Sequence, residues 1–316
     1  MNGPVAPALA RLATEPEYRH TAGFVVVRNG ETIAAHGLGR PIDEPADVFS
    51  VTKSVLSTVV ALAARDGELG LDETLGKLLG DRVRPDRARA TVRHVLEMTG
   101  GAHADDPILD IDEIQASPAG WVDQLLARPQ ERPPGAAFSY DNGSAHELSA
   151  ALAARLGPVD DYAARRIFRP LGIDRWHWPR DPEGVAWGYG GLELSALALA
   201  RLGEAWRTDE LDLGVLLIEA TTRRTAGGPP ENRPYGRMFW IDEVAGLPAF
   251  FAGGYAGQHV LVVPSAGLTL VTTGDESRLL TDWRWRPGLE VTRELAAQLA
   301  PGSARVGRAD AVRTPR

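Results

Sequence analysis

The sequence contains no cysteine among its 316 residues. Without thiols the protein has no disulfide, no thiolate metal site and no cysteine nucleophile, so covalent catalysis must use another side chain. The seven histidines are dispersed and form no His-Glu-x-x-His or comparable ligand spacing. No Gly-x-x-x-x-Gly-Lys phosphate loop occurs either. We therefore expect no metal ion and no other cofactor.

A net positive charge is also lacking, because the abundant arginines are scattered among a larger number of Asp and Glu residues. The formal net charge is -8 and the pI is near 5.5, whereas a nucleic-acid-binding surface needs a basic face to displace counterions. No window approaches the roughly 20 apolar residues of a membrane span. Residues 1–20 lack the apolar run of a secretory signal. We expect a cytoplasmic protein with neither a nucleic-acid nor a membrane partner.

Lysine is nearly missing, because the chain uses arginine almost everywhere it places a cation. The two lysines are Lys53 and Lys77. Lys53 lies in the stretch DVFSVTKSVLSTVVALAARDGEL, three residues after Ser50. A desolvated lysine loses its proton far more readily than an arginine, so a rare lysine indicates a place where a neutral amine is useful. Lys77 is predicted to be a solvated surface residue.

The apolar patterns indicate an α+β fold. The run GFVVVRNGETIAAHGLG joins two β-branched segments through Asn29-Gly30, which predicts a hairpin because both turn residues need positive φ. From Val51 to about Gly67, apolar residues recur at helical spacing on most sides, which predicts a buried helix. After Gly190 a helical stretch precedes three β-rich runs, and an amphipathic helix follows them.

These patterns predict one antiparallel β-sheet flanked by helices, with a mostly helical insertion on one side. Residues 1–68 and 185–300 are expected to form the sheet domain, and residues 69–184 the helical insertion domain. The segment 301–316 is rich in Pro, Gly and Arg and is expected to be a disordered tail.

Ser50 and Lys53 form the first candidate for chemistry. They are three residues apart at the start of the predicted helix, so their side chains project within one turn of each other. A serine hydroxyl is a weak nucleophile until a base takes its proton, and a desolvated lysine can be that base. Free N–H groups at a helix start also help to hold an oxyanion. The alternative for Ser50 is a plain N-cap, which does not explain Lys53.

The second candidate is the Tyr-Asp-Asn triplet that begins at Tyr140, within PPGAAFSYDNGSAHELSAAL. It lies in a loop before a helix predicted to begin near Ala145. Tyr140 is expected to share or relay the proton between Ser50 and Lys53, and the Asn142 amide to orient Lys53 or a substrate carbonyl. The competing interpretation is an Asx-type turn with a packed tyrosine.

The third candidate is FFAGGYAGQHVLVVP, in which glycines lead into a strand and allow another backbone or a substrate to approach closely. The backbone of Gln258 is expected to supply a second oxyanion donor. Trp187, Trp240 and the acidic segment HADDPILDIDE are candidates for a substrate entrance. The competing interpretation is that the tryptophans are core and the charges face solvent.

The order SVTK, YDN and a glycine-rich strand resembles the serine β-lactamase and penicillin-binding-protein-like hydrolases. The spacing is similar to their class C-like branch, close to the esterase and 6-aminohexanoate-oligomer hydrolase-like members. The resemblance runs from about residue 21 to residue 300 and implies the β-lactamase/transpeptidase-like fold. It implies that Ser50 is the acylated nucleophile, that Lys53 and Tyr140 are the proton-transfer pair, and that Asn142 is a positioning residue.

The third motif departs from the family pattern. Members often carry Lys-Thr-Gly or His-x-Gly there, whereas the residues aligned here are Tyr255-Ala256-Gly257, followed by Gln258. Because the missing cation helps to bind a substrate carboxylate in penicillin recognition, the resemblance implies a small neutral ester or amide substrate. Tyr255, Gly257 and Gln258 are expected to position the substrate or hold the oxyanion.

The predicted function is a serine hydrolase that acts on an ester or amide through an acyl-enzyme at Ser50. One alternative is a transacylase that uses the same residues in a biosynthetic reaction. The other is a non-catalytic ligand-binding relative.

Overall fold

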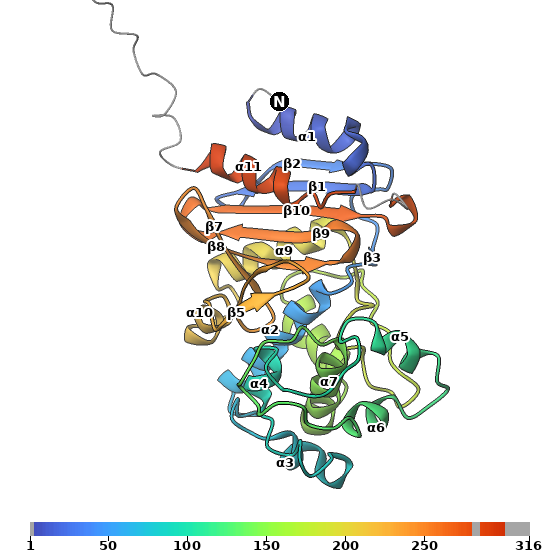
Figure 1. Cartoon of the computed structure of the whole chain (residues 1–316). Helices are drawn as coiled ribbons and strands as arrows, with labels where there is room; N and C mark the ends of the chain where they lie inside the picture. The colour runs from blue at the N-terminus through green and yellow to red at the C-terminus, as the bar shows by residue number, and fades with distance from the viewer. Residues whose placement is uncertain (1–2, 280–284, 301–316) are drawn as a thin grey trace, which may run out of the picture.

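An eight-stranded antiparallel sheet crosses the upper half of the molecule in Figure 1. The computed structural model describes residues 3–279 and 285–300, so the expected tail at 301–316 lies outside the described residues. The sheet order is β2-β1-β10-β9-β8-β7-β6-β5. The strands are β1 (Thr21–Arg28), β2 (Glu31–Gly37), β5 (Thr225–Gly228), β6 (Arg233–Tyr235), β7 (Trp240–Val244), β8 (Leu247–Gly254), β9 (Gln258–Val263) and β10 (Leu268–Gly274). The predicted fold class, an antiparallel sheet with flanking helices, is confirmed.

Strands from the two ends of the chain lie side by side in this sheet. The hairpin predicted from Asn29-Gly30 joins β1 to β2, with φ of 50° at Asn29 and 83° at Gly30. Strand β1 pairs on its other edge with β10. The sheet is therefore assembled across about 240 intervening residues, which places its formation among the slow, non-local steps of folding.

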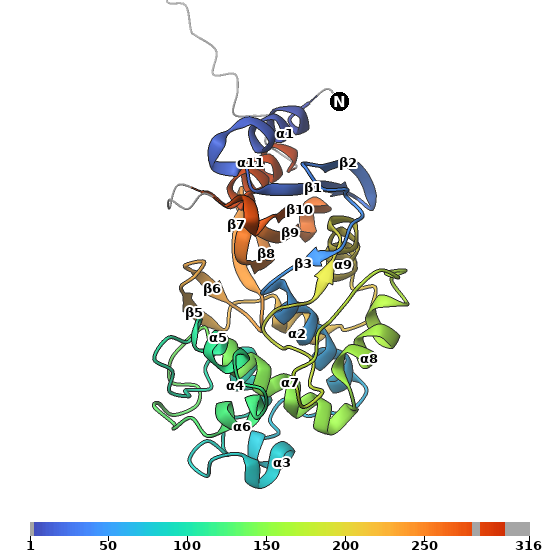
Figure 2. The same cartoon turned by 90° about the vertical axis from the view of Figure 1, so that its right-hand side faces the viewer.

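Helices cover both faces of the sheet (Figure 2). Helices α1 (Val5–Thr14) and α11 (Leu289–Leu299) pack together on one face, and α9 (Ala196–Thr208) packs on the other face against β1, β9 and β10. The sequence patterns predicted α9 and α11 but missed α1. Helix α10 (Val215–Ala220) contacts α2.

The segment between the two sheet portions is helical. Its main helices gather at the lower end of Figure 1, away from the sheet. They are α3 (Leu75–Leu79), α4 (Val92–Leu96), α5 (Asp110–Gln115), α6 (Trp121–Leu126), α7 (Asn142–Leu156) and α8 (Val159–Ala163). A small ladder of β3 (Ala46–Asp47) with β4 (Glu193–Leu194) lies where the chain passes between the two parts. The division at residues 68 and 184 stays a prediction. None of the described helices combines the length and apolar character needed to cross a bilayer.

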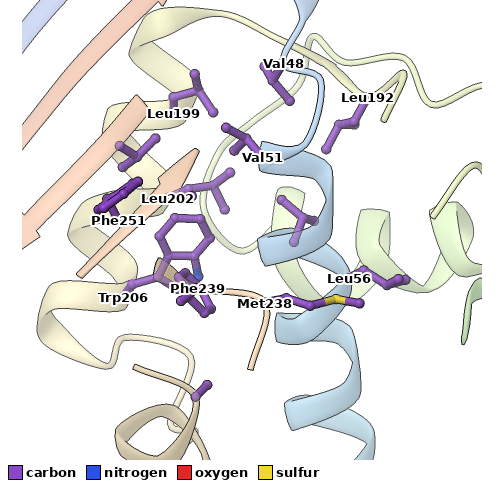
Figure 3. Close-up of a cluster of buried hydrophobic side chains, with 14 of the residues drawn as sticks. Val48, Val51, Leu56, Leu192, Leu199, Leu202, Trp206, Met238, Phe239 and Phe251 are labelled. Carbon is purple, nitrogen blue, oxygen red and sulfur yellow. The ribbon is translucent and has the colours of Figure 1, made fainter. Parts of the chain in front are cut away.

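Helix α2 (Val51–Arg65) passes between the sheet and the helical part. Each of its residues from Val51 to Ala63 is buried, as its nearly continuous apolar pattern predicted. Figure 3 shows Val51 of α2 pointing toward Leu199 and Leu202 of α9, whereas Leu56 points to the opposite side of α2. Trp206 of α9 also donates from Nε1 to Thr58 Oγ1 of α2 at 3.0 Å. These contacts fix the position of α2, and therefore of the residues at its N-terminal end.

We expect Leu202→Ala to lower the free energy of unfolding by about 3 kcal/mol, because it leaves a cavity in this core. Leu202 is fully buried between α9 and α2. Leu197→Ala is the matched control, since Leu197 lies on the same helix with 38% of its surface exposed, and should cost under about 1 kcal/mol. Urea denaturation measures both values. Equal losses in the two variants would contradict the central packing described for α9.

Candidate active site

Ser50 directly precedes α2 at the N-terminal end of the helix, in the αR conformation. The preceding residue, Phe49, has a φ of 47°, a value that is costly for an aromatic residue. Asp47 offsets this strain, because its Oδ1 accepts the N–H groups of Phe49 at 2.6 Å and of Gly191 at 3.1 Å. Burial raises the pKa of the Asp47 carboxyl, and these two donors oppose the rise. Asp47 thus links the turn before Ser50 to the backbone at Gly191 and fixes the position of this turn.

Lys53 is buried beneath Ser50, with 1% of its surface exposed. Its Nζ lies 2.8 Å from Ser50 Oγ and 2.8 Å from the carbonyl oxygen of Tyr189. Burial lowers the pKa of Lys53 to about 7, although the charge of Asp141 opposes this. At that pKa the amine is largely neutral in slightly alkaline solution, where it donates to Tyr189 and can accept the proton of the Ser50 hydroxyl. The plain N-cap alternative fails, since the Ser50 side chain caps no helix N–H.

Tyr140 completes the group around Ser50. Its buried ring lies 4.9 Å from Lys53 Nζ and stacks on Trp240 with centroids 5.5 Å apart. Burial raises the pKa of Tyr140 far above its ordinary value, while a hydrogen bond with Ser50 opposes the rise. The phenol therefore keeps its proton at neutral pH. The structure brings Ser50, Lys53 and Tyr140 together, as the sequence predicted.

A buried ion network fixes the loop that carries Tyr140. Arg128 holds Asp141 with two hydrogen bonds of 3.0 and 3.1 Å and reaches Glu147 of α7 at 3.0 Å. Glu147 in turn forms two hydrogen bonds with Arg87, at 2.6 and 2.8 Å. Burial alone would raise the pKa of Asp141, but the Arg128 guanidinium holds it below its usual value. The loop at Asp141 is therefore fixed by buried ion pairs, and the simple Asx-type turn that the sequence allowed does not describe it.

The expectation that Asn142 orients Lys53 is wrong, whereas its predicted contact with a substrate carbonyl stays a prediction. Helix α7 begins at Asn142, three residues earlier than predicted. Its Nδ2 donates one hydrogen to the carbonyl oxygen of Ile108 at 2.7 Å, and the amide nitrogen carries a second hydrogen. Among the described residues the partners of Lys53 Nζ are Ser50 and Tyr189, not Asn142. Asn142 lines the cavity next to Ser50, with its Oδ1 buried and without a partner in the described chain.

The third motif also differs from the expectation. Gly254, at the end of β8, approaches Ser50 so closely that an added Cβ would lie 3.2 Å from Ser50 N and 2.5 Å from Val48 O. The N–H of Gln258 donates to Tyr255 O within the 3₁₀ turn η4 (Tyr255–Gly257), and its side chain bonds to the backbone of β10. Gln258 is therefore not the free oxyanion donor that the sequence predicted.

A cavity of about 560 Å³ opens above Ser50. Tyr255 lines it, with 55% of its surface exposed and its ring against Phe49, whereas Gly257 and Gln258 are not among the lining residues. Trp187 and part of the acidic segment also line it, as expected for an entrance. Trp240 instead is core, buried behind Tyr140. The lining residues are Asp47, Phe49, Ser50, Ile108, Leu109, Ile111, Asp112, Gln115, Asn142, Trp187, Tyr189, Gly190, Gly191, Tyr255 and Glu276.

Sequence reasoning missed three residues that shape this site. Tyr189 supplies the carbonyl that receives Lys53, Asp47 holds the turn before Ser50, and Gly254 lets β8 approach. The run WGYGG around Tyr189 carried a signal, because clustered glycines allow close backbone approach. Within residues 3–279 and 285–300, no three His, Asp or Glu side chains are grouped to hold a metal ion.

At the start of a buried helix, a serine is hydrogen-bonded to a desolvated lysine, and this helix lies between an antiparallel sheet and a helical part. This is the arrangement of β-lactamase/transpeptidase-like proteins. The family model described as Beta-lactamase matches residues 9–282. The chain belongs to this family, which confirms the resemblance found in the motifs.

Solved structures with the same fold share little sequence with the chain. An octameric penicillin-binding protein homologue from Pyrococcus abyssi has a TM-score of 0.78 and 18% identity, over 95% of this chain and 77% of that one. A 6-aminohexanoate-dimer hydrolase candidate from Bacillus anthracis has a TM-score of 0.74 and 19% identity, over 88% of this chain and 78% of that one. A D-stereospecific amidohydrolase from Streptomyces sp. has a TM-score of 0.68 and 20% identity, over 86% of this chain and 96% of that one. No curated protein matches the chain.

The amine of Lys53 is expected to titrate near pH 7, because burial opposes its charged form. Nuclear magnetic resonance of protein labelled in its lysine side chains measures this directly. Since the chain has two lysines, Lys77→Arg leaves one lysine signal to follow and assigns it. A titration midpoint near pH 10 for Lys53 would contradict the neutral amine.

Proposed function

We propose that the protein is a serine hydrolase that cleaves an ester or amide through an acyl-enzyme at Ser50. The observation that carries the proposal is the 2.8 Å contact between Ser50 Oγ and the Nζ of a buried lysine whose pKa is lowered to about 7. A neutral amine at this distance is placed to take the hydroxyl proton as the oxygen attacks. The family and the neighbours named as hydrolases support hydrolysis as the reaction class.

In the proposed acylation, Ser50 Oγ forms a bond to the carbonyl carbon while its proton passes to Lys53. The carbon–heteroatom bond then breaks, and the leaving group receives a proton through Tyr140, which Lys53 reprotonates. In deacylation a water molecule attacks the ester, and its proton follows the same path in reverse. Tyr140 suits the relay because its raised pKa keeps the phenol protonated between transfers. Lys53 suits the role of base because its pKa lies near neutrality.

The proposed oxyanion site consists of the N–H groups of Ser50 and Tyr255. Ser50 N–H lies at the start of α2, where the first amides have no partner within the helix. Tyr255 follows Gly254 directly and is the first residue of the η4 turn, so its amide is among those that have no partner within the turn. A Cβ added at Gly254 would lie 3.2 Å from Ser50 N, so the residue directly before Tyr255 is in close contact with the backbone of Ser50. Amides of this kind stabilise the negative charge that develops on the carbonyl oxygen.

Labelling with a fluorophosphonate tests the nucleophile and its base. Ser50→Ala should take up no label at this site, and Lys53→Arg should be labelled about 10³-fold more slowly, because a guanidinium does not deprotonate. Lys77→Arg is the matched control, since Lys77 is exposed, as predicted, and pairs with Glu73. In native protein the labelling rate should rise with pH through about 7, as the neutral fraction of Lys53 increases. Intact mass spectrometry measures the adduct.

Rapid labelling of Lys53→Arg would exclude the lysine as base. If folded native protein acquires no adduct from the fluorophosphonate or from a p-nitrophenyl ester, the hydrolase proposal fails. The non-catalytic relative then becomes the better description.

Gly254→Ala is expected to lower kcat/KM for ester hydrolysis by about 10²-fold, which is typical for the loss of one oxyanion donor. The new methyl group would overlap Val48 O and press on Ser50 N, so β8 must move away from the nucleophile. Gly100→Ala is the control, because its Cβ would meet only ordinary contacts of 3.9 Å and beyond. A normal rate in Gly254→Ala, with circular dichroism showing both variants folded, would contradict the proposed role of this strand.

A further inference from the structure

The backbone segment that receives Lys53 is rich in glycine. Three of the five residues at positions 187–191 are glycines, which have more conformational freedom to lose on folding than any other residue. The carbonyl oxygen of Tyr189 nevertheless lies 2.8 Å from Lys53 Nζ. On the far side of Tyr189 the chain is fixed by Asp47, which accepts the N–H of Gly191 at 3.1 Å. Its position before Tyr189 depends on contacts from another element.

His146 of α7 supplies such a contact. Its side chain is fully buried, and its Nδ1 accepts the N–H of Gly188 at 3.4 Å. A Cβ added at Gly188 would overlap Ala145 O, so the segment also touches the backbone of α7 here. The His146 ring meets the ring of Tyr189 edge-on, with centroids 5.8 Å apart. Helix α7 therefore contacts both Tyr189 and the residue directly before it.

Asp181 determines which nitrogen of His146 carries the proton. Its Oδ2 lies 3.0 Å from His146 Nε2, and its Oδ1 accepts the N–H groups of Glu183 and Val185 at 2.8 Å each. Burial raises the pKa of the Asp181 carboxyl, but the hydrogen bonds from His146 and from the two backbone donors hold it below its usual value. Because an ionised carboxylate only accepts, Nε2 carries the proton and Nδ1 keeps a lone pair for Gly188.

We propose that His146 and Asp181 are positioning residues of the hydrolase, which hold the Tyr189 carbonyl against Lys53. Helix α7 begins two residues after Tyr140, so one helix places two of the groups that surround the amine. Neither His146 nor Asp181 is among the residues that line the cavity, and neither takes part in bond breaking. The inference rests on the hydrolase proposal, since it concerns how the proposed base is held.

Asp181→Asn tests the role of the tautomer. The two backbone donors keep the amide oxygen on their side, so the new amide N–H faces His146 Nε2 and moves the ring proton to Nδ1. The Nδ1–H and the N–H of Gly188 are then two donors that face each other without an acceptor. We expect fluorophosphonate labelling of Ser50 to become about tenfold slower, because the segment must shift to relieve this conflict.

Asp160→Asn is the matched control for this variant. Asp160 is buried to a similar extent, and its partner is Arg180, which directly precedes Asp181 in the chain. The substitution therefore removes a charge of the same kind at the same loop and leaves the His146 tautomer unchanged. We expect it to alter the labelling rate by less than about twofold.

Two replacements of His146 separate its two hydrogen bonds. The amide of Asn extends as far as Nδ1, so His146→Asn keeps an acceptor for Gly188 and loses the contact with Asp181. The longer Gln extends as far as Nε2, so His146→Gln keeps the contact with Asp181 and leaves the Gly188 N–H unpaired. We expect labelling within about threefold of the native rate for Asn and about tenfold slower for Gln. Side-chain volume alone predicts the reverse order, since Gln fills the space of His better.

The titration midpoint of Lys53 provides a readout that a loss of stability alone does not move. It is measured by nuclear magnetic resonance in the Lys77→Arg background, which leaves one lysine signal. In Asp181→Asn and His146→Gln the midpoint should fall by about half a pH unit, because the ammonium form loses an acceptor that stabilises it. In His146→Asn and Asp160→Asn it should stay at the native value.

The two proposals fail in distinguishable ways. If native protein is labelled at Ser50 and the Lys53 midpoint and labelling rate are native in both Asp181→Asn and His146→Gln, the positioning role is wrong and the hydrolase stands. Equal slowing in Asp160→Asn and Asp181→Asn would also overturn it. If Asp181→Asn does not fold, the order of the two His146 variants decides. If native protein takes no label, the hydrolase proposal fails, and the positioning role in catalysis fails with it.

Discussion

The removal of the Lys53 amine from water is the constraint on which the rest of the site depends. An amine surrounded by Ser50, the Tyr140 ring and the Tyr189 carbonyl has too little solvation to hold its charge at its usual pKa. That loss of solvation is unfavourable for stability, but it leaves an amine with a lowered pKa beside the Ser50 hydroxyl. The packing around α2 excludes water from this amine. Helix α2 is buried on nearly all sides, and Tyr140 covers the amine from the helical part.

Charges elsewhere in the helical part are buried only where they are paired. Arg87, Glu147, Arg128 and Asp141 form a chain of ion pairs that anchors the loop before α7. Breaking one member would leave a partner uncompensated, so the network specifies one position for this loop. The contrast with Lys53 is direct, because no carboxylate of the described residues pairs with Lys53, and burial lowers the pKa of its amine instead. The paired charges therefore fix the position of the loop before α7, whereas the amine of Lys53, which lacks such a partner among the described residues, contacts the Ser50 hydroxyl.

The sequence predicted much of the site, and its errors have a common cause. The Ser-x-x-Lys spacing is local, so helical geometry alone brings Ser50 and Lys53 together. The hairpin at Asn29-Gly30 follows in the same way from two turn residues. The placement of Gln258 was wrong because it depended on where a strand ends and a turn begins. Gly254 occupies the place near Ser50, and a shift of a few residues moves an amide away from Ser50.

The sequence by itself determined the α+β class, the pairing of Ser50 with Lys53, and the motif order that identifies the family, because each depends on residue type and short spacing. Only the tertiary structure decided which groups meet across long distances. Tyr189 reaches Lys53 over 136 positions of chain, and the cavity wall joins α5 to the segment after β10. Such contacts depend on the packing of the sheet against the helical part, and no local pattern of residues encodes them.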